Sequence, residues 1–259
     1  MNRVRGIAER TMSLVAQEKA FEEADAVIAT SQAVSRDLLE FYPALENRMH
    51  VLGLGVHRVA QEPRSCFEPT VVFSGRFDSI KRLPLLLKAM EEVVTKLPDA
   101  RLLVLGGNPG NPKVERRWHK RLKSEISPEL QERLTVLGWL TTDEVWEQLD
   151  TASIIVIPSL YETFGLSLLE AMAKGLAAIV SPAGGLAELV QDERNGLIVQ
   201  SDEANAWSQA LLQLLTDPEK TLAMGEASRN IVVERMQWKT VALQWEASFL
   251  KLCGAQKCK

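Results

Sequence analysis

Short apolar runs rich in β-branched residues alternate with longer amphipathic segments through most of this chain, and that alternation limits its fold more than any other feature. Six runs have the composition of buried strands, at residues 70–75, 100–107, 134–139, 153–159, 176–182 and 196–200. Helical patterns follow them, at residues 82–97, 112–126, 141–150, 165–174, 184–192 and 203–216. Strands that alternate with helices in this way predict a parallel sheet. We therefore predict an α/β fold with a Rossmann-like parallel sheet flanked by helices.

The regular alternation occupies residues 64–235, which we predict to be one Rossmann-like domain. Residues 236–259 contain a C-terminal helix pattern, and residues 1–63 precede the domain. This first part contains a strand pattern at 26–30 and then a helix pattern that Ser31 can cap. It is too short for a second domain of the same kind, and its polar, proline-containing end suits a linker.

The composition excludes several classes of protein. A net charge of −4 is not that of a nucleic-acid-binding surface. The three cysteines are not spaced as zinc ligands, and no run reaches the roughly 18 apolar residues of a spanning helix. The first residues lack the apolar core of a signal peptide. We expect a cytoplasmic protein with no transmembrane segment, and the basic helix pattern at 112–126 leaves open a peripheral contact with the inner face of the membrane.

The most informative segment for function follows the fourth expected strand, because ligands of such sheets bind at the carboxyl ends of the strands. Here Glu162 lies in a loop, Gly165 begins a helix and Glu170 lies further along that helix. Backbone amides at a helix N-terminus attract anions, and glycine lets a phosphate approach closely. Glu162 can accept hydrogen bonds from sugar hydroxyls, and Glu170 from a ribose. By spacing alone, a capped helix with two solvated glutamates is the more common arrangement.

The residues around those two glutamates resemble a motif of a known family. Residues 158–173 resemble the E-x7-E element of the retaining group-one glycosyltransferases, which have the GT-B fold. Further segments typical of that family occur in the same order along the chain and are Gly75-Arg76-Phe77 with Lys81, Leu137-Gly138, Gly184-Gly185 with Glu188, and Asn195-Gly196-Leu197-Ile198-Val199. The resemblance covers about residues 64–235 and extends more weakly back to about residue 20. It implies the C-terminal, donor-binding half of a GT-B fold, preceded in residues 1–63 by a remnant of the acceptor domain and the linker.

The resemblance also implies a role for each matching residue. Glu162 would contact the transferred sugar, while Arg76 and Lys81 would neutralise the donor diphosphate, so these three are the expected catalytic residues. Glu170 would hold the ribose. The other expected donor-binding residues border the diphosphate or the base and are Gly75, Gly138, Trp139, Leu140, Phe164, Gly165 and Leu166. Trp139 suits either stacking on the base or ordinary packing. The family needs no metal or other cofactor, and the chain contains no Asp-x-Asp motif.

We therefore expect a retaining glycosyltransferase of the hexosyltransferase type, which takes a nucleotide-diphosphate sugar as donor in polysaccharide, lipopolysaccharide or other glycoconjugate synthesis. With most of an acceptor domain missing, the isolated chain is expected to be inactive, and to dock a separate N-terminal acceptor-domain subunit or to self-associate. Apolar surface should then be exposed near Val27, Ile28, Leu38 and Leu39. The alternative is a non-catalytic nucleotide-sugar-binding or partner-binding module. An unrelated Rossmann oxidoreductase or epimerase is disfavoured, because no dinucleotide fingerprint occurs.

Overall fold

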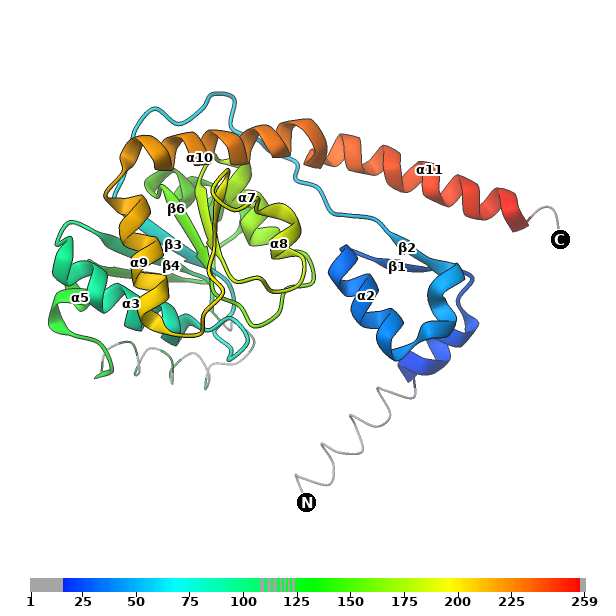
Figure 1. Cartoon of the computed structure of the whole chain (residues 1–259), viewed down its shortest axis with the longest axis horizontal. Helices are drawn as coiled ribbons and strands as arrows, with labels where there is room; N and C mark the ends of the chain where they lie inside the picture. The colour runs from blue at the N-terminus through cyan, green and yellow to red at the C-terminus, as the bar shows by residue number, and fades with distance from the viewer. Residues whose placement is uncertain are drawn as a thin grey trace, which may run out of the picture.

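A six-stranded, wholly parallel sheet forms the centre of the larger of the two parts of the molecule seen in Figure 1. The computed structural model describes residues 16–107 and 124–256, and between them only residues 110, 113, 116, 118, 120 and 122. The strands are β3 (Thr70–Ser74), β4 (Arg101–Leu105), β5 (Leu134–Gly138), β6 (Ile154–Ile157), β7 (Ala177–Val180) and β8 (Gly196–Ile198). The α/β class and all six expected strands are confirmed, and each strand is somewhat shorter than its sequence pattern.

Helices cover both faces of this sheet, as the alternating pattern predicts. They are α3 (Leu83–Lys96), α5 (Pro128–Arg133), α6 (Thr142–Gln148), α7 (Leu166–Ala173), α8 (Leu186–Leu189), α9 (Ala204–Leu215) and α10 (Pro218–Ile231), with a 3-10 turn at Leu149–Thr151. The helix expected at 112–126 falls partly outside the described residues, and so do Arg117, Arg121 and Lys123 of its basic run.

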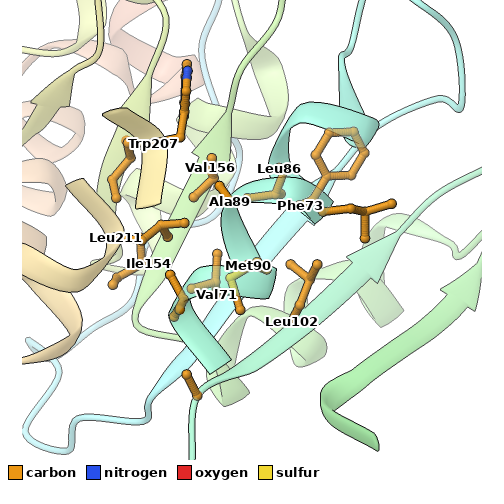
Figure 2. Close-up of a cluster of buried hydrophobic side chains, with 14 of the residues drawn as sticks. Val71, Phe73, Leu86, Ala89, Met90, Leu102, Ile154, Val156, Trp207 and Leu211 are labelled. Atoms are coloured by element: carbon orange, nitrogen blue, oxygen red, sulfur yellow. The ribbon is translucent and has the colours of Figure 1, made fainter. Parts of the chain in front are cut away.

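Alternate residues along each strand supply the two halves of the core, because successive side chains of a strand point to opposite faces. On one face, Val71, Phe73 and Ile154 pack beneath α3 and α9, whose Met90 and Trp207 are fully buried (Figure 2). On the other face a second buried cluster packs beneath α7. Full burial of one such aliphatic or aromatic side chain contributes about 1.5–3 kcal/mol.

The strand order places a crevice between two particular strands. Along the sheet the order is β5-β4-β3-β6-β7-β8, so the chain first winds outward from β3 through β4 to β5 and then returns to β6 on the other side of β3. In open parallel sheets the loops diverge at this reversal, and ligands bind there beyond the carboxyl ends of the strands. The loops that follow β3 and β6 therefore flank the expected binding crevice.

The N-terminal segment, residues 16–52, forms a small unit beside the sheet (Figure 1). Its strands β1 (Val27–Ala29) and β2 (Met49–Val51) pair in parallel, and α2 (Gln32–Phe41) follows β1, with a 3-10 helix at Pro43–Arg48. Ser31 caps α2 as expected, since its side chain accepts a hydrogen bond from the backbone of Val34.

The expected exposure of apolar residues on this unit is largely wrong. Val27 is buried, while Ile28, Leu38 and Leu39 are half-buried. Among the described residues of this unit, the large apolar side chain that is exposed is Phe41, at 75%. Val27 alternates inward on its short strand, and the pattern of the sequence did not show which elements would cover it.

The linker between the N-terminal segment and the sheet domain lies beside the later stretch of chain that leaves the sheet domain. Val56 of the linker forms a parallel bridge with Gln237, just before the last helix, α11 (Trp238–Gln256). A β-carbon added at Gly55 would lie 2.9 Å from the Cα atom of Trp238, so the two chains approach closely enough to require glycine here. A π-helical turn at Val232–Met236 joins α10 to α11. From there α11 extends away from the sheet (Figure 1).

Candidate functional site

The loops after β3 and β6 meet across the crevice between those two strands. The first loop is residues 75–82. The second is residues 158–165, which we call the donor loop because the sequence predicts that it binds the donor. The backbone amide of Leu160 donates a hydrogen bond of 2.8 Å to the carbonyl of Ile80, which joins the two loops. Expected site residues from two distant parts of the sequence are therefore brought together at the reversal of the strand order.

A compact polar cluster occupies this junction. The ammonium Nζ of Lys81 pairs with Oε1 of Glu162, and the hydroxyl of Ser159 donates to the same oxygen at 3.0 Å. The side chains of Lys81 and Glu162 are only 21% and 13% exposed. Solvent and salt therefore screen this partly buried pair less than they screen an ion pair on the surface. Sequence analysis singled out Lys81 and Glu162 but missed Ser159, whose proximity depends on the turn of the donor loop.

Asp78 organises the loop after β3. Its Oδ1 accepts a hydrogen bond of 3.0 Å from the backbone of Lys81, and its Oδ2 lies 3.5 Å from the Nη2 atom of Arg76. The side chain of Arg76 is 68% exposed, so it stands at the surface of the crevice rather than within the Lys81–Glu162 pair. Arg82 has a left-handed backbone, with φ of 54°, at the start of α3 and forms an ion pair of 2.7 Å with Asp202. Neither Asp78 nor Arg82 carried a recognisable signal in the sequence.

Two glycines support the backbone of Glu162. The amide of Gly185 donates to the carbonyl of Glu162 at 2.9 Å. A β-carbon at Gly184 would lie only 2.0 Å from that same oxygen, and Gly184 has a φ of +56°. The pair Gly184-Gly185 is therefore explained by close approach of two chains, which only glycine permits.

The donor loop ends where α7 begins. Gly165 precedes the helix with a φ of 99°, in the left-handed region that favours glycine. Phe164 is 5% exposed and its ring packs in the second core cluster, so the ring is not available to a donor. Leu166 in the first turn is 49% exposed. A β-carbon at Gly165 would lie 2.8 Å from the Cδ2 atom of Leu186, so glycine here lets the chain pack closely against α8. The amides of the first turn of α7 can attract an anion, as at other helix starts.

Glu170 lines a cavity of about 330 Å³. The cavity lies between α7, α6 and the linker, and its lining residues are Gly55, Val56, His57, Arg58, Thr142, Asp143, Val145, Trp146, Leu149, Leu166 and Glu170. Burial raises the pKa of the Glu170 carboxyl above its usual range. An ion pair of 2.7 Å between Arg58 and Asp143 joins the linker to α6 beside this space. The linker residues of the cavity were not among the expected site residues.

Three glycines lie side by side at the carboxyl ends of β3, β4 and β5. The amide of Gly75 donates to Leu105 at 3.0 Å, and that of Gly106 donates to Gly138 at 2.7 Å. A β-carbon at Gly106 would lie 2.2 Å from the carbonyl oxygen of Gly75. Beyond Gly138, Trp139 is 64% exposed, so ordinary packing of this side chain in the core is the wrong alternative. Leu140 is half-buried against the second core cluster.

A family model described as "Glycosyl transferases group 1" matches residues 60–231, which is more than half of the chain. The chain belongs to the group 1 glycosyl transferase family. The chain accordingly resembles solved GT-B structures. It superposes on the sucrose-phosphate synthase of Thermosynechococcus elongatus with a TM-score of 0.78 and 27% identity, covering 95% of this chain and 62% of the other. It superposes on Anabaena HepE, crystallised in complex with UDP and glucose, with a TM-score of 0.77 and 20% identity, covering 91% of this chain and 65% of the other.

Curated relatives of this chain have specific activities in their names. The alpha-maltose-1-phosphate synthase of Mycolicibacterium smegmatis is 31% identical over 253 residues, which are 88% of this chain and 63% of the relative. The D-inositol 3-phosphate glycosyltransferase of Corynebacterium aurimucosum is 29% identical over 248 residues, 90% of this chain and 58% of the relative. The chain thus spans about 60% of the length of the curated relatives that it matches.

Two further observations concern the described part of the chain. Among the described residues, no three or more histidine, cysteine, aspartate or glutamate side chains gather as they would around a metal ion. Within the same part of the chain, no helix combines the length and apolar character needed to cross a bilayer. The positive groups at the crevice are side chains and backbone amides, namely Lys81, the exposed Arg76 and the start of α7.

Proposed function

We propose that this chain forms the donor site of a retaining glycosyltransferase that uses a nucleoside-diphosphate sugar. The observation that carries the proposal is the cluster of Lys81, Glu162 and Ser159 at the reversal of the strand order. It places a cation and a carboxylate together at the carboxyl ends of the strands, next to a glycine-led helix start. Those are the groups that a sugar joined to a diphosphate requires.

The diphosphate would lie between Lys81 and the start of α7 at Gly165. There the ammonium, the helix amides and the more exposed charge of Arg76 would stabilise the negative charge that develops on the departing nucleoside diphosphate. Pre-arranged charges of this kind are usually the largest single contribution to catalysis. Because these groups are organic cations and amides, we propose that no metal is required.

Glu162 and Glu170 would bind opposite ends of the donor. Glu162 lies in the donor loop, where its carboxylate can accept hydrogen bonds from hydroxyls of the transferred sugar. Glu170 lines the 330 Å³ cavity, where its carboxylate can accept hydrogen bonds from a ribose. The base would then extend toward Gly138, Trp139 and Leu140. UDP and UDP-glucose in complexes of Anabaena HepE support a uridine nucleotide as the first ligand to test.

An acceptor-type half would complete the enzyme. Parallel sheets are normally buried on both faces, yet the parallel pair of β1 and β2 has only two strands. Near it, α11 exposes Leu243, Phe249 and Leu250 along one side. We propose that the rest of an acceptor domain packs on these surfaces, either in one longer chain or as a separate subunit. The enzyme would work in the cytoplasm on precursors of polysaccharides or other glycoconjugates.

A transfer assay separates an enzyme from a non-catalytic donor-binding module. The chain by itself should transfer no radiolabelled sugar from a nucleotide sugar, because holding donor and acceptor together can lower a barrier by about 7–11 kcal/mol. Fusion to the unmatched part of the Mycolicibacterium smegmatis relative should restore transfer, with the anomeric configuration of the donor retained in the product. A folded fusion that binds the donor but transfers nothing would favour the binding module.

A further inference from the structure

The N-terminus of α2 lies directly against the donor loop. The hydroxyl of Ser31, which caps α2, donates a hydrogen bond of 2.7 Å to the carbonyl of Thr163, and the Thr30 hydroxyl reaches the same oxygen at 3.3 Å. Ser31 is only 2% exposed. The carbonyl of the residue that follows Glu162 therefore accepts two hydrogen bonds from the N-terminal segment.

Glu188 holds the same helix end from the other side. Its Oε2 accepts a hydrogen bond of 3.0 Å from the backbone of Gln32, and its Oε1 accepts one of 2.7 Å from Ala33. Both donors belong to the first turn of α2, whose amides have no partners within the helix. A carboxylate at this position benefits from charge-assisted hydrogen bonds and from the helix dipole.

The two segments that grip α2 are the same two that position Glu162. One is the donor loop itself, in which Tyr161 also donates a hydrogen bond of 2.8 Å to Asp37 of α2. The other runs from Gly184 to Glu188, and its Gly185 amide binds the carbonyl of Glu162. Burial and the hydrogen bond to Asp37 raise the pKa of Tyr161 to about 12, so its phenol stays a donor throughout the physiological range.

We propose that Glu188 is a positioning residue, whose grip on the N-terminus of α2 couples the docking of the N-terminal segment to the shape of the donor loop. When Glu188 is bonded to the N-terminus of α2, the carbonyl of Thr163 accepts the hydrogen bond from Ser31, and the Glu162 backbone is held between Thr163 and Gly185. Glu162 then presents its carboxylate to the crevice. The proposal rests on the proposed function only in taking the donor loop as the place where the sugar binds. Because coupling is reciprocal, a bound sugar should in turn strengthen the contact between Glu188 and α2.

The first arm of the test needs no ligand. Hydrogen exchange resolved at single amides should show faster exchange of Gln32 and Ala33 in Glu188→Ala than in the wild-type chain. Glu188→Gln should be intermediate, because its amide oxygen can still accept one of the two bonds. Glu132→Ala, which removes an exposed glutamate of α5, is the matched control and should change nothing at these amides. Equal exchange rates of the Gln32 and Ala33 amides in the wild-type chain and in Glu188→Ala would show that Glu188 does not hold α2.

The second arm measures coupling to the donor. UDP-glucose should slow exchange at Gln32 and Ala33 in the wild-type chain. Glu188→Ala should weaken UDP-glucose binding about tenfold, the effect of one lost charge-assisted hydrogen bond, and change UDP binding by less than about twofold. Glu188→Gln should recover part of the affinity. Faster exchange in Glu188→Ala with unchanged UDP-glucose affinity would overturn the coupling and leave a simple attachment between domains.

The two arms also separate this proposal from the proposed function. If the wild-type chain bound no nucleotide sugar of any base, the proposed function would be overturned, and the coupling to a donor with it. The exchange rates of Gln32 and Ala33 in the ligand-free variants would still decide whether Glu188 holds α2.

Discussion

The ammonium of Lys81 is paired with the carboxylate of Glu162 across the crevice between β3 and β6. Each group comes from the carboxyl end of a different strand, and the hydroxyl of Ser159 supports the shared oxygen. The expected phosphate-binding cation and the expected sugar-binding carboxylate therefore satisfy each other. A donor would insert its diphosphate beside Lys81 and its sugar beside Glu162, and so keep both side chains partnered.

Replacement of Lys81 should weaken the binding of a nucleoside diphosphate. Lys81→Met removes one charge-assisted contact to phosphate, worth about 1.5–3 kcal/mol, so the dissociation constant should rise roughly ten- to a hundredfold. Titration calorimetry with UDP measures the change. Lys88→Met removes an exposed lysine of α3 and serves as control. A similar, small effect of both substitutions would mean that Lys81 does not contact the diphosphate.

The two glutamates should respond differently to free nucleotide and nucleotide sugar. Glu170→Ala should weaken UDP and UDP-glucose alike, because both ligands carry the ribose. Glu162→Ala should spare UDP and weaken only UDP-glucose, since its carboxylate is expected to contact the sugar. Each lost hydrogen bond by a charged group corresponds to about 1.5–3 kcal/mol. Equal losses for both ligands in both variants would contradict these roles.

The raised pKa of Glu170 predicts a pH dependence of donor binding. Burial favours the neutral acid, so Glu170 takes up a proton at a pH at which an exposed glutamate is still charged. In the ligand-free protein this contribution to stability is present at low pH and is lost as the pH rises through the raised pKa. A ribose needs the charged form. Affinity for UDP-glucose should therefore fall as the pH decreases from neutral toward that pKa, with release of a proton on binding.

Calorimetry of UDP-glucose in buffers of different ionisation enthalpy detects the released proton. UDP-glucose suits this measurement better than UDP, whose terminal phosphate itself titrates near neutral pH. Glu170→Gln has no carboxyl group to titrate, so its affinity should be lower and nearly independent of pH. Proton release that persists unchanged in Glu170→Gln would assign the effect to another group.

Gly184 should be intolerant of any side chain. In Gly184→Ala the new β-carbon would meet the carbonyl oxygen of Glu162, and alanine in the left-handed region costs about 1–2 kcal/mol before any clash. The free energy of unfolding should fall by at least about 2 kcal/mol. Gly254→Ala in α11 has nothing within 4 Å of its new β-carbon and should instead stabilise the helix by up to about 1 kcal/mol. Chemical denaturation compares the two, and equal stability of both variants would refute the close approach at Gly184.

The fold followed from the sequence where local pattern determines structure. Strands such as β6 are unbroken apolar runs, and Ser31 carries its capping role in its own residue type. The donor loop was found because the neighbourhood of Glu162 resembles a family motif. What could not be predicted depends on contacts between distant segments. Nothing local indicates that Lys81 pairs with Glu162, or that Glu188 reaches the N-terminus of α2.

The exposure of single side chains was the other feature that could not be predicted from the sequence. The sequence left Trp139 between stacking and packing, and the turn after β5 leaves it 64% exposed. Val27 was expected at the surface, but its strand turns it inward. In both cases the choice depends on which element covers the residue, and a pattern of apolar positions along one chain segment does not contain that information.

The most direct test of the donor site is titration calorimetry of the purified chain with UDP, GDP and ADP in the presence of a metal chelator. Lys81, Arg76 and the start of α7 supply the positive potential without a metal, so at least one of the three nucleotides should bind saturably with one site per chain. Absence of saturable binding of all three by a folded chain would contradict a nucleoside-diphosphate-sugar donor site.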